Sequence, residues 1–194
     1  KHSEYLTLIE QSGNHLLEIV NDVLDMSKIE AGEFELKETN IDLAEITQDC
    51  MRVVSFEAEN AKISLFSKIY TNTSRLLGDQ RVIKQILLNL ISNALKYSRE
   101  NGVIEIIVEK PNAGGITLIV KDTGIGMTPL ELSESLEPYR RIENTHTSQT
   151  QGTGLGLPLV RSFCRLHDAR FDIESIEAVG TTVSIAFPSW RNTE

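Results

Sequence analysis

The sequence predicts an α+β fold: a two-layer sandwich in which helices cover one face of a mixed, mostly antiparallel sheet, preceded by one long helix. Three observations support this prediction. Apolar or small residues recur at steps of three and four through about the first thirty positions, as along one face of a helix. Several later segments alternate apolar and polar residues, as strands do. Short turn-forming stretches join some of these segments, which favours hairpins.

The first helix is expected to end at Gly32, in the C-cap position. Its stripe is widened by Leu17 and Leu24 and otherwise follows a 3-4 spacing: Leu6, Ile9, Gly13, Leu16, Val20, Val23 and Ser27. This spacing is typical of a coiled-coil or bundle seam. A lone helix cannot bury such a stripe, so we expect it to pair outside this chain or across a dimer. Packing on its own domain is the alternative.

The elements after residue 33 follow in order along the chain. We expect a strand at 33–39, a helix from Asp42 to about Ala61, a strand at 63–69 and a helix from Asp79 to about Ser98. Segments 102–110 and 115–122 form a hairpin, and residues 124–153 lack strand periodicity. A helix over about 154–167 and a second hairpin over 169–188 complete the fold.

Composition bounds the class of protein and its partners. The 194 residues carry a net charge of −9, which argues against nucleic acid or an anionic membrane as the main partner. Cys50 and Cys164 lie far apart and are expected to be buried reduced thiols, as in a cytoplasmic protein. No apolar run is long enough to span a membrane. The chain begins at Lys1 rather than Met, so we expect a fragment, and a membrane anchor elsewhere in a longer protein stays open.

The segment NLISNALKYS, residues 89–98, places a polar stripe on a helix that is otherwise apolar. Gln85, Asn89, Asn93 and Lys96 fall within roughly 80° on a helical wheel. Neutral amide oxygens suit a Mg²⁺ ion whose charge is met mainly by phosphates. The ammonium of Lys96 could neutralise those phosphates. An ordinary solvated helix face is the alternative interpretation.

Two glycine clusters favour a nucleotide site. DTGIGM, residues 122–127, follows a strand, and Asp122 could accept a hydrogen bond from an exocyclic amine. Gly124 and Gly126 would let the backbone approach a flat ring, although Asp-x-Gly is also a common turn. GTGLGL, residues 152–157, opens a helix whose free N–H groups suit phosphate oxygens. A flexible connection is the alternative there.

In this order, NLISNALKYS, DTGIGM and GTGLGL resemble the N, G1 and G2 boxes of sensor histidine kinases, which line the ATP site of the Bergerat fold. SGNHLLEIVNDVLDMSKIEAG looks like the second helix of their dimerisation and histidine-phosphotransfer domain, and LGDQRVIKQILLNL and GTTVSIAFP match the usual flanks. The resemblance implies a partial dimerisation domain at 1–32. It also implies a catalytic ATP-binding domain at 33–194, with a lid at about 128–153.

The resemblance also implies roles for individual residues. Asp122 would hold the adenine amine, and Asn93 with Asn89 would coordinate Mg²⁺. Lys96 and Tyr97 would line the nucleotide. The two glycine boxes would complete the ATP site: Gly124 and Gly126 in the first, and Gly152, Thr153, Gly154, Leu155 and Gly156 in the second.

The chain departs from the family pattern in two places. The F box usually carries two phenylalanines, and LEPYRR has Leu136 and Tyr139 in their places, which could loosen the lid. Arg140 and Arg141 are either phosphate contacts or a solvated pair. The larger departure is that no histidine is followed by glutamate, as the phosphoacceptor normally is: His2, His15, His146 and His167. We therefore expect no autophosphorylation by this chain alone.

The resemblance implies a kinase that passes the γ-phosphoryl of ATP to an upstream histidine, and from there to an aspartate on a response regulator receiver domain. The bundle helices would form a homodimer, and the fragment itself would not contact a membrane. A pseudokinase or signalling scaffold is the first alternative, motivated by the altered F box. A conformational ATPase is the second, opposed by Asn89, because the hydrolysing relatives place a glutamate there. A serine kinase acting on a partner protein is the third.

Overall fold

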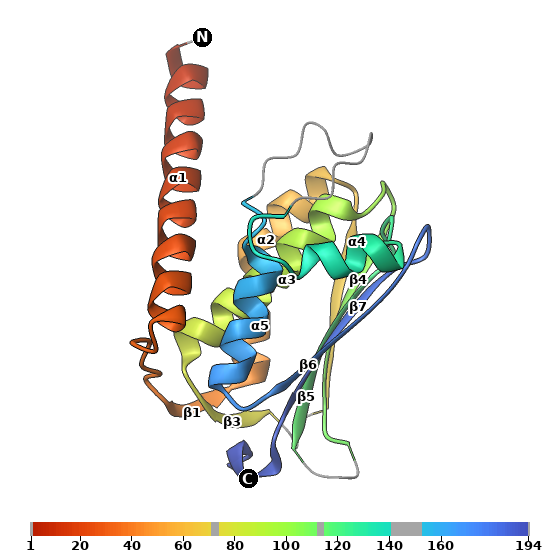
Figure 1. Ribbon diagram of the computed structural model, residues 1–194. Coiled ribbons are helices and arrows are strands. Elements are labelled where there is room, and N and C mark those ends of the chain that lie inside the picture. The colour runs from red at the N-terminus through yellow and green to blue at the C-terminus, as the bar shows by residue number, and fades with distance from the viewer. Residues whose placement is uncertain (1, 71–73, 112–114, 141–152, 194) are drawn as a thin grey trace.

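Five strands form the larger sheet, and helices cover one of its faces (Figure 1). The computed structural model describes residues 2–70, 74–111, 115–140 and 153–193, without the side chains of 2–12, 14, 15 and 18. The strand order is β2-β4-β5-β7-β6, and only the β2–β4 pair is parallel. The predicted mixed, mostly antiparallel sheet is therefore confirmed. Its strands are β2 (Ser64–Ile69), β4 (Val103–Glu109), β5 (Ile116–Asp122), β6 (Arg170–Ile176) and β7 (Gly180–Phe187).

A small second sheet pairs β1 (Thr39–Asp42) with β3 (Arg75–Gly78), antiparallel. The strand expected at 33–39 is wrong, because residues 33–38 run outside any strand and only Thr39 belongs to β1. Alternation in this segment instead lets Phe34 and Leu36 pack against the core. The sequence prediction also missed β3, which is only four residues long.

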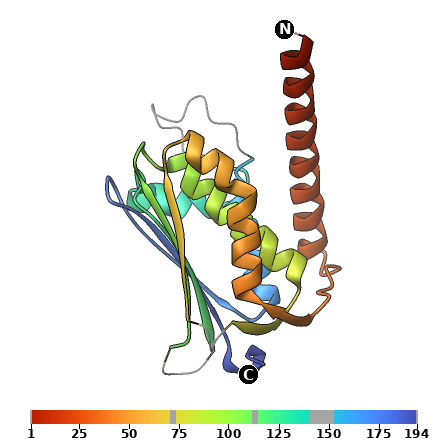
Figure 2. The same cartoon turned by 180° about the vertical axis from the view of Figure 1, so that it is seen from behind.

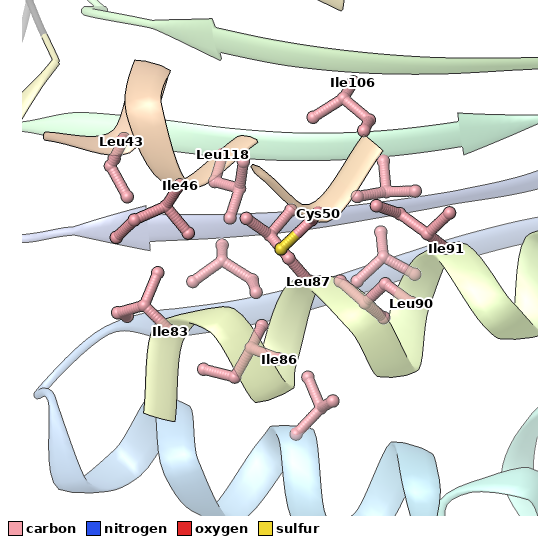
Figure 3. Packing of buried hydrophobic residues seen from close by; sticks show 14 of the residues in the cluster. Leu43, Ile46, Cys50, Ile83, Ile86, Leu87, Leu90, Ile91, Ile106 and Leu118 are labelled. Atoms are coloured by element: carbon pink, nitrogen blue, oxygen red, sulfur yellow. The ribbon is translucent and has the colours of Figure 1, made fainter. Parts of the chain in front are cut away.

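Three helices form the layer over the sheet: α2 (Leu43–Asn60), α3 (Gln80–Tyr97) and α5 (Gly156–Leu166). Asp42 caps α2 by accepting a hydrogen bond from the Ala44 N–H, and Asp79 caps α3 in the same way. Both predicted helix starts are confirmed. Figure 3 shows α2 and α3 meeting the strands through aliphatic side chains: Leu43, Ile46, Ile83, Ile86, Leu87, Leu90, Ile91, Ile106 and Leu118.

Helix α1 (His2–Glu30) stands away from the sandwich along most of its length (Figure 2). The N–H of Gly32 donates to the Ile29 carbonyl and the N–H of Glu33 to the Lys28 carbonyl, which is a Schellman ending with Gly32 at a φ of +71°. Near this end, Met26 is buried and α1 contacts α5. Farther up, Leu17 and Leu24 are 61% and 50% exposed. The described part of the stripe is thus mostly exposed, with only Val23 half-buried, and the buried Met26 lies beside the stripe rather than in it.

A further helix, α4 (Pro129–Ser135), lies within residues 124–153, the stretch that lacks strand periodicity. Thr128 and Glu131 form a capping box around its first turn, and Pro129 occupies a position where a missing N–H costs nothing. The described part of 124–153 contains no strand, as its lack of strand periodicity predicts, but the sequence analysis did not predict helix α4. Residues 141–152 of the predicted lid lie outside the described residues.

Both cysteines are buried and free, as expected. Burial raises the pKa of the Cys50 thiol to about 11 and that of Cys164 to about 12, so both stay protonated near neutral pH. Within the described ranges, no helix combines the length and apolar character that a membrane span requires.

The apolar face of α3 yields the first testable prediction. Ile91 is fully buried, so Ile91→Ala should lower the free energy of unfolding by about 3 kcal/mol through lost burial and the cavity left behind. Ser92 is exposed on the same helix, and Ser92→Ala should change it by less than about 0.5 kcal/mol. Urea unfolding of both variants measures the difference. Equal effects would contradict the assigned faces of α3.

Candidate functional site

The polar stripe of α3 is half-buried rather than fully solvated along its length. At its start, the Nε2 of Gln85 donates to the Oδ1 of Asp22 on α1 at 3.3 Å. At its end, the Nζ of Lys96 lies 5.1 Å from the centroid of the Tyr97 ring, in cation–π contact. Asn89 and Asn93 lie between these two ends. The start of the stripe therefore contacts α1 through Gln85, whereas its other end, at Lys96, lies beside the Tyr97 ring.

Asn89 carries an unsatisfied polar atom. Its Nδ2 is buried and, among the described residues, has no hydrogen-bond partner. Leaving a buried polar atom unpaired costs about 1–3 kcal/mol, so such an atom is suited to bind a ligand or water. The oxygen and nitrogen of the amide can exchange places by rotation, so either can face that ligand.

Asp122 ends β5 with its carboxylate held by the backbone. Its Oδ1 accepts hydrogen bonds from the N–H of Gly124 at 2.8 Å and of Thr181 at 3.2 Å. In the described chain, no group donates to Oδ2. Burial raises the pKa of Asp122 above its ordinary value, and the two backbone N–H groups oppose that rise. The carboxylate is therefore oriented, partly desolvated and able to accept one more donor.

The first glycine box follows a path that side chains would block. A Cβ at Gly124 would lie 2.5 Å from the Tyr97 carbonyl oxygen and 2.8 Å from the Oδ1 of Asp122. Gly126 has a φ of +62°, and its Cβ would lie 1.9 Å from the Ile176 carbonyl oxygen. The Ile125 N–H donates to the Tyr97 carbonyl at 3.0 Å. These contacts fasten the DTGIGM loop to the end of α3 and to the β6–β7 hairpin.

The second glycine box brings the start of α5 to the stripe. Gly156 begins α5, and its Cβ would lie 3.6 Å from the Nδ2 of Asn93. No side chain caps this helix. The Thr153 hydroxyl accepts from the N–H of Leu155, the residue before α5 begins, and not from an N–H of the helix. Uncapped N–H groups beside an asparagine amide are suited to phosphate oxygens. Gly152 lies outside the described residues.

The altered F box lies where α4 ends. Leu136 is the C-cap of α4 and is half-buried, whereas Tyr139 is 65% exposed and has a φ of +63°. The Tyr139 N–H donates to the Gly154 carbonyl at 3.2 Å, and a Cβ at Gly154 would lie 2.7 Å from the Arg140 carbonyl oxygen. Backbone contacts therefore join residues 139 and 140 to the second glycine box. Arg141 lies outside the described residues.

His167 is a buried structural residue. Its Nε2 accepts from the Asp79 N–H at 3.2 Å, and its Nδ1 lies 2.9 Å from the Phe163 carbonyl oxygen. Burial lowers its pKa, which keeps the ring neutral with the proton on Nδ1. His146, and the side chains of His2 and His15, lie outside the described part of the chain.

The sequence prediction missed the residues that hold Asp122 from the β6–β7 side. The Thr181 N–H reaches the carboxylate, and Gly180 has a φ of +140° with its Cβ position 2.1 Å from the Asp122 carbonyl oxygen. The Ser175 hydroxyl accepts from the Met127 N–H at 2.9 Å. The sequence feature that could have revealed these residues is the Gly180-Thr181-Thr182 run that opens the last strand.

These groups fit a nucleotide with its cation. The oriented carboxylate of Asp122 suits an amine, the glycine path suits a flat ring, and the start of α5 suits phosphates. Among the described residues, no cluster of three or more His, Cys, Asp or Glu could hold a metal alone. A metal at Asn89 and Asn93 would thus need further ligands from phosphate oxygens, which is the ordinary arrangement for Mg²⁺.

Comparison with known proteins identifies the family. A family model described as histidine kinase-, DNA gyrase B-, and HSP90-like ATPase matches residues 78–191. The chain belongs to this family. Within it, the chain is 40% identical over 188 residues to the histidine protein kinase DivJ of Caulobacter vibrioides, covering 97% of this chain and 31% of that protein. It is 35% identical over 199 residues to the cell-division control histidine kinase PdhS of Brucella anthropi, covering 98% and 19%.

Solved structures of this family share the fold. Full-length ShkA, solved in complex with AMPPNP, matches with a TM-score of 0.80 and 26% identity, over 95% of this chain and 38% of that one. The histidine kinase AdeS of Acinetobacter baumannii matches in fold with a TM-score of 0.77 at 19% identity, over 95% of this chain and 83% of that one. The chain thus spans 31% and 19% of the lengths of DivJ and PdhS.

The position of Gly124 yields the second prediction. Gly124→Ala should displace the Asp122 carboxylate, because the new Cβ would lie well inside contact distance of Oδ1 and of the Tyr97 carbonyl oxygen. We expect the affinity for a non-hydrolysable ATP analogue, measured by calorimetry, to fall by about tenfold or more. Gly13→Ala on α1 meets nothing within 4 Å and should leave affinity unchanged. Unaltered binding by the Gly124 variant would contradict the assigned path.

Proposed function

We propose that this chain is the ATP-binding catalytic domain of a sensor histidine kinase, joined to one helix of its dimerisation domain. One observation carries the proposal: the fold brings the Asp122 carboxylate, the Asn89–Asn93 stripe and the uncapped start of α5 to one end of the helical layer. The family membership and the sequence likeness to named histidine kinases support it. The AMPPNP bound by ShkA supports ATP as the ligand.

Asp122 is the proposed adenine contact. Its Oδ1 is committed to two backbone N–H groups, which leaves Oδ2 to accept from the adenine amine. Gly124 and Gly126 would let the ring lie against backbone, because neither has a side chain in the way. Lys96 and Tyr97 lie at the same end of α3 and would line the nucleotide.

The amides of Asn89 and Asn93 are the proposed Mg²⁺ ligands. The buried, unpartnered polar atom of Asn89 and the closeness of Asn93 to the start of α5 support this role. Bound there, Mg²⁺ would neutralise phosphate charge and orient the γ-phosphoryl group. Thr153, Gly154, Leu155 and Gly156 would offer backbone N–H groups to the phosphates, and Gly152 would extend that loop.

The chemistry favoured is transfer to a histidine. A lone pair of a neutral imidazole nitrogen attacks the γ-phosphorus, and the bond from that phosphorus to the bridging oxygen breaks to release ADP. Imidazole is nucleophilic without a general base, whereas water needs one. The Asn89 amide cannot accept a proton in that way, so its position argues against efficient hydrolysis. The same reasoning disfavours a conformational ATPase.

The remaining parts of the proposal concern the whole protein, of which this chain is expected to be one part. Residues 1–32 would belong to the dimerisation domain, and the exposed stripe of α1 would pair with bundle helices in a homodimer. The phosphoacceptor would lie upstream, and a response regulator receiver domain in the cytoplasm would take the phosphoryl group. The lid would span about 128–153, beginning with α4.

A pseudokinase or scaffold is the second candidate, and the altered F box favours it. Tyr139 is exposed rather than packed into the domain, and Leu136 is only half-buried, so aromatic anchorage of the lid is reduced. Backbone pairing between Tyr139 and Gly154 offsets part of that loss. Nucleotide binding without phosphoryl transfer by the full-length protein would favour this candidate.

Asp122→Asn separates binding from folding. The asparagine oxygen can still accept from Gly124 and Thr181, but its NH₂ would face the adenine amine donor to donor. We expect affinity for an ATP analogue with Mg²⁺ to fall about 10- to 100-fold. Thermal stability should stay equal or rise slightly, because burial makes the native carboxylate costly to ionise. A variant that binds like the wild type would refute the assignment.

Binding should also depend on pH through Asp122. Its pKa is raised in the free protein, so acidification protonates it earlier than an ordinary aspartate and weakens its bond to the adenine amine. Affinity should therefore fall as the pH drops from 7 through this raised pKa. Asp122→Asn should show a flatter profile over the same range, as measured by calorimetry with the same analogue. Parallel profiles would place the titrating group elsewhere.

Phosphoryl transfer needs the full-length protein. With γ-labelled ATP, we expect label on an upstream histidine, and its absence from a folded, nucleotide-binding protein would favour the scaffold. Asn89→Glu would introduce a carboxylate beside the phosphate region and should raise ATP hydrolysis relative to transfer. Wild-type hydrolysis that matches this variant would instead favour the conformational ATPase.

A further inference from the structure

We propose that Asp79 is a positioning residue that ties the segment between α1 and the ATP domain to both helices of the nucleotide site. This segment, the linker, comprises residues 31–38. The inference rests on the proposed function, because it concerns how that site is held relative to α1. Asp79 could cap α3, and the site could contact a nucleotide, without this connection to the linker.

The Asp79 carboxylate divides its two oxygens between two elements. Oδ1 accepts from the N–H groups of Arg81 at 3.0 Å and Val82 at 3.3 Å, which caps α3. Oδ2 accepts from the Lys37 N–H at 2.9 Å, which holds the linker. Asp79 is only 3% exposed, so water competes little with either set of bonds. A single rigid side chain therefore joins the linker to the helix that carries the asparagine stripe.

The backbone of Asp79 makes the third connection. Its N–H donates to the Nε2 of His167, and the Nδ1 of that ring bonds the Phe163 carbonyl at the end of α5. The ring is fully buried between the backbone at Gly78 and the edge of Phe187, so it has little room to move. The C-terminal end of α5 is thus fixed against the N-terminal end of α3.

Other contacts close the linker onto the same place. The centroid of the Phe34 ring lies 5.5 Å from that of the Phe163 ring. The guanidinium carbon of Arg81 lies 5.5 Å from the same Phe34 centroid. The buried Arg191 binds the Glu38 carboxylate at 2.5 Å and the Leu77 carbonyl at 3.0 Å. Each partner belongs to β3, α3, α5 or the C-terminal turn η2 (Ser189–Arg191). The linker is held on both sides of Lys37, the residue that binds Asp79.

The two helices joined at this point meet the nucleotide site at their other ends. Asn93 lies toward the C-terminal end of α3, and Gly156 begins α5. Helices are stiff, so a change in the angle between α3 and α5 at the phosphates must be taken up where Asp79 and His167 bind each other. Because Oδ2 of Asp79 also holds the linker, that change reaches the attachment of α1. Asp79 therefore positions the ATP site for transfer and couples its state to α1.

Asp79→Asn tests the linker bond while leaving the cap in place. The asparagine oxygen can replace Oδ1 at Arg81 and Val82, whereas its NH₂ at the Oδ2 position faces the Lys37 N–H donor to donor. Asp42→Asn is the matched control, since Asp42 caps α2 through Oδ1 and no described group donates to its Oδ2. We expect amide hydrogen exchange at 33–38 to accelerate on the order of tenfold in the Asp79 variant, with α3 still protected. Exchange unchanged from the Asp42 control would overturn the proposal.

Lys37→Pro removes the N–H donor and keeps Asp79 intact. It therefore tests the same bond without any other effect of replacing Asp79. Spin labels at the exposed Asn21 and Lys121 report the orientation of α1 against the sheet. We expect a broader distance distribution in both linker variants, and loss of the shift that an ATP analogue with Mg²⁺ causes in the wild type. A shift equal in all variants, or no shift in a wild type that binds the analogue, would overturn the coupling.

Nucleotide affinity separates this inference from the proposed function. The Asp79 variant should bind the analogue within about twofold of wild type, because its site residues are distant from the change. In the full-length protein, its autophosphorylation should show a lower kcat with a KM for ATP near that of wild type. Wild-type chain that binds no nucleotide would defeat the proposed function, whereas linker exchange would still test the bond. If the Asp79 variant lost nucleotide affinity but showed no change in linker exchange or in kcat, Asp79 would be a structural residue and the proposal would be wrong.

Discussion

Helix α3 must satisfy two opposite requirements, and the rest of the structure depends on how it does so. One face carries fully buried aliphatic side chains that join α2 and α5 to the sheet: Ile83, Ile86, Leu87 and Ile91. The other carries asparagines that lower helix propensity and leave a buried amide atom unpaired in the described chain. The apolar face provides the stability that a helix with such a stripe lacks by itself. Polar groups are thereby fixed beside the glycine loops.

The sequence predicts the long elements of this fold because each has a recognisable residue pattern, and two of the helices also begin at a capping residue. Asp42 and Asp79 mark the starts of α2 and α3, and largely apolar, β-branched runs mark β4 and β5. The short elements were missed because few residues carry their pattern. The wrong strand at 33–39 has a physical cause: its alternation is real, but the Lys37 N–H bonds a carboxylate rather than a neighbouring strand. Periodicity in the sequence indicates which side chains are buried, but it does not indicate which groups the backbone N–H and C=O hydrogen-bond to.

The candidate site was predictable where its residues lie close together in sequence, as in the stripe of α3 and the DTGIGM segment. Its long-range contacts were not. The bond from Thr181 to Asp122 joins residues 59 positions apart, and that from Gln85 to Asp22 joins residues 63 apart. Helical spacing grouped Gln85 with the asparagines, although its side chain bonds α1. Which part of a polar stripe meets a ligand, and which meets another helix, depends on tertiary packing.

Asp122 and Asp79 show how burial acts on two carboxylates with different tasks. Every oxygen of Asp79 accepts from described backbone N–H groups, which meets the requirement that a buried charge be fully bonded. At Asp122 only Oδ1 does so, and burial raises the pKa. A carboxylate needed only for folding gains nothing from that incomplete bonding. The unfilled acceptor is what a binding group requires, because an incoming amine can then supply the bond that the protein withholds.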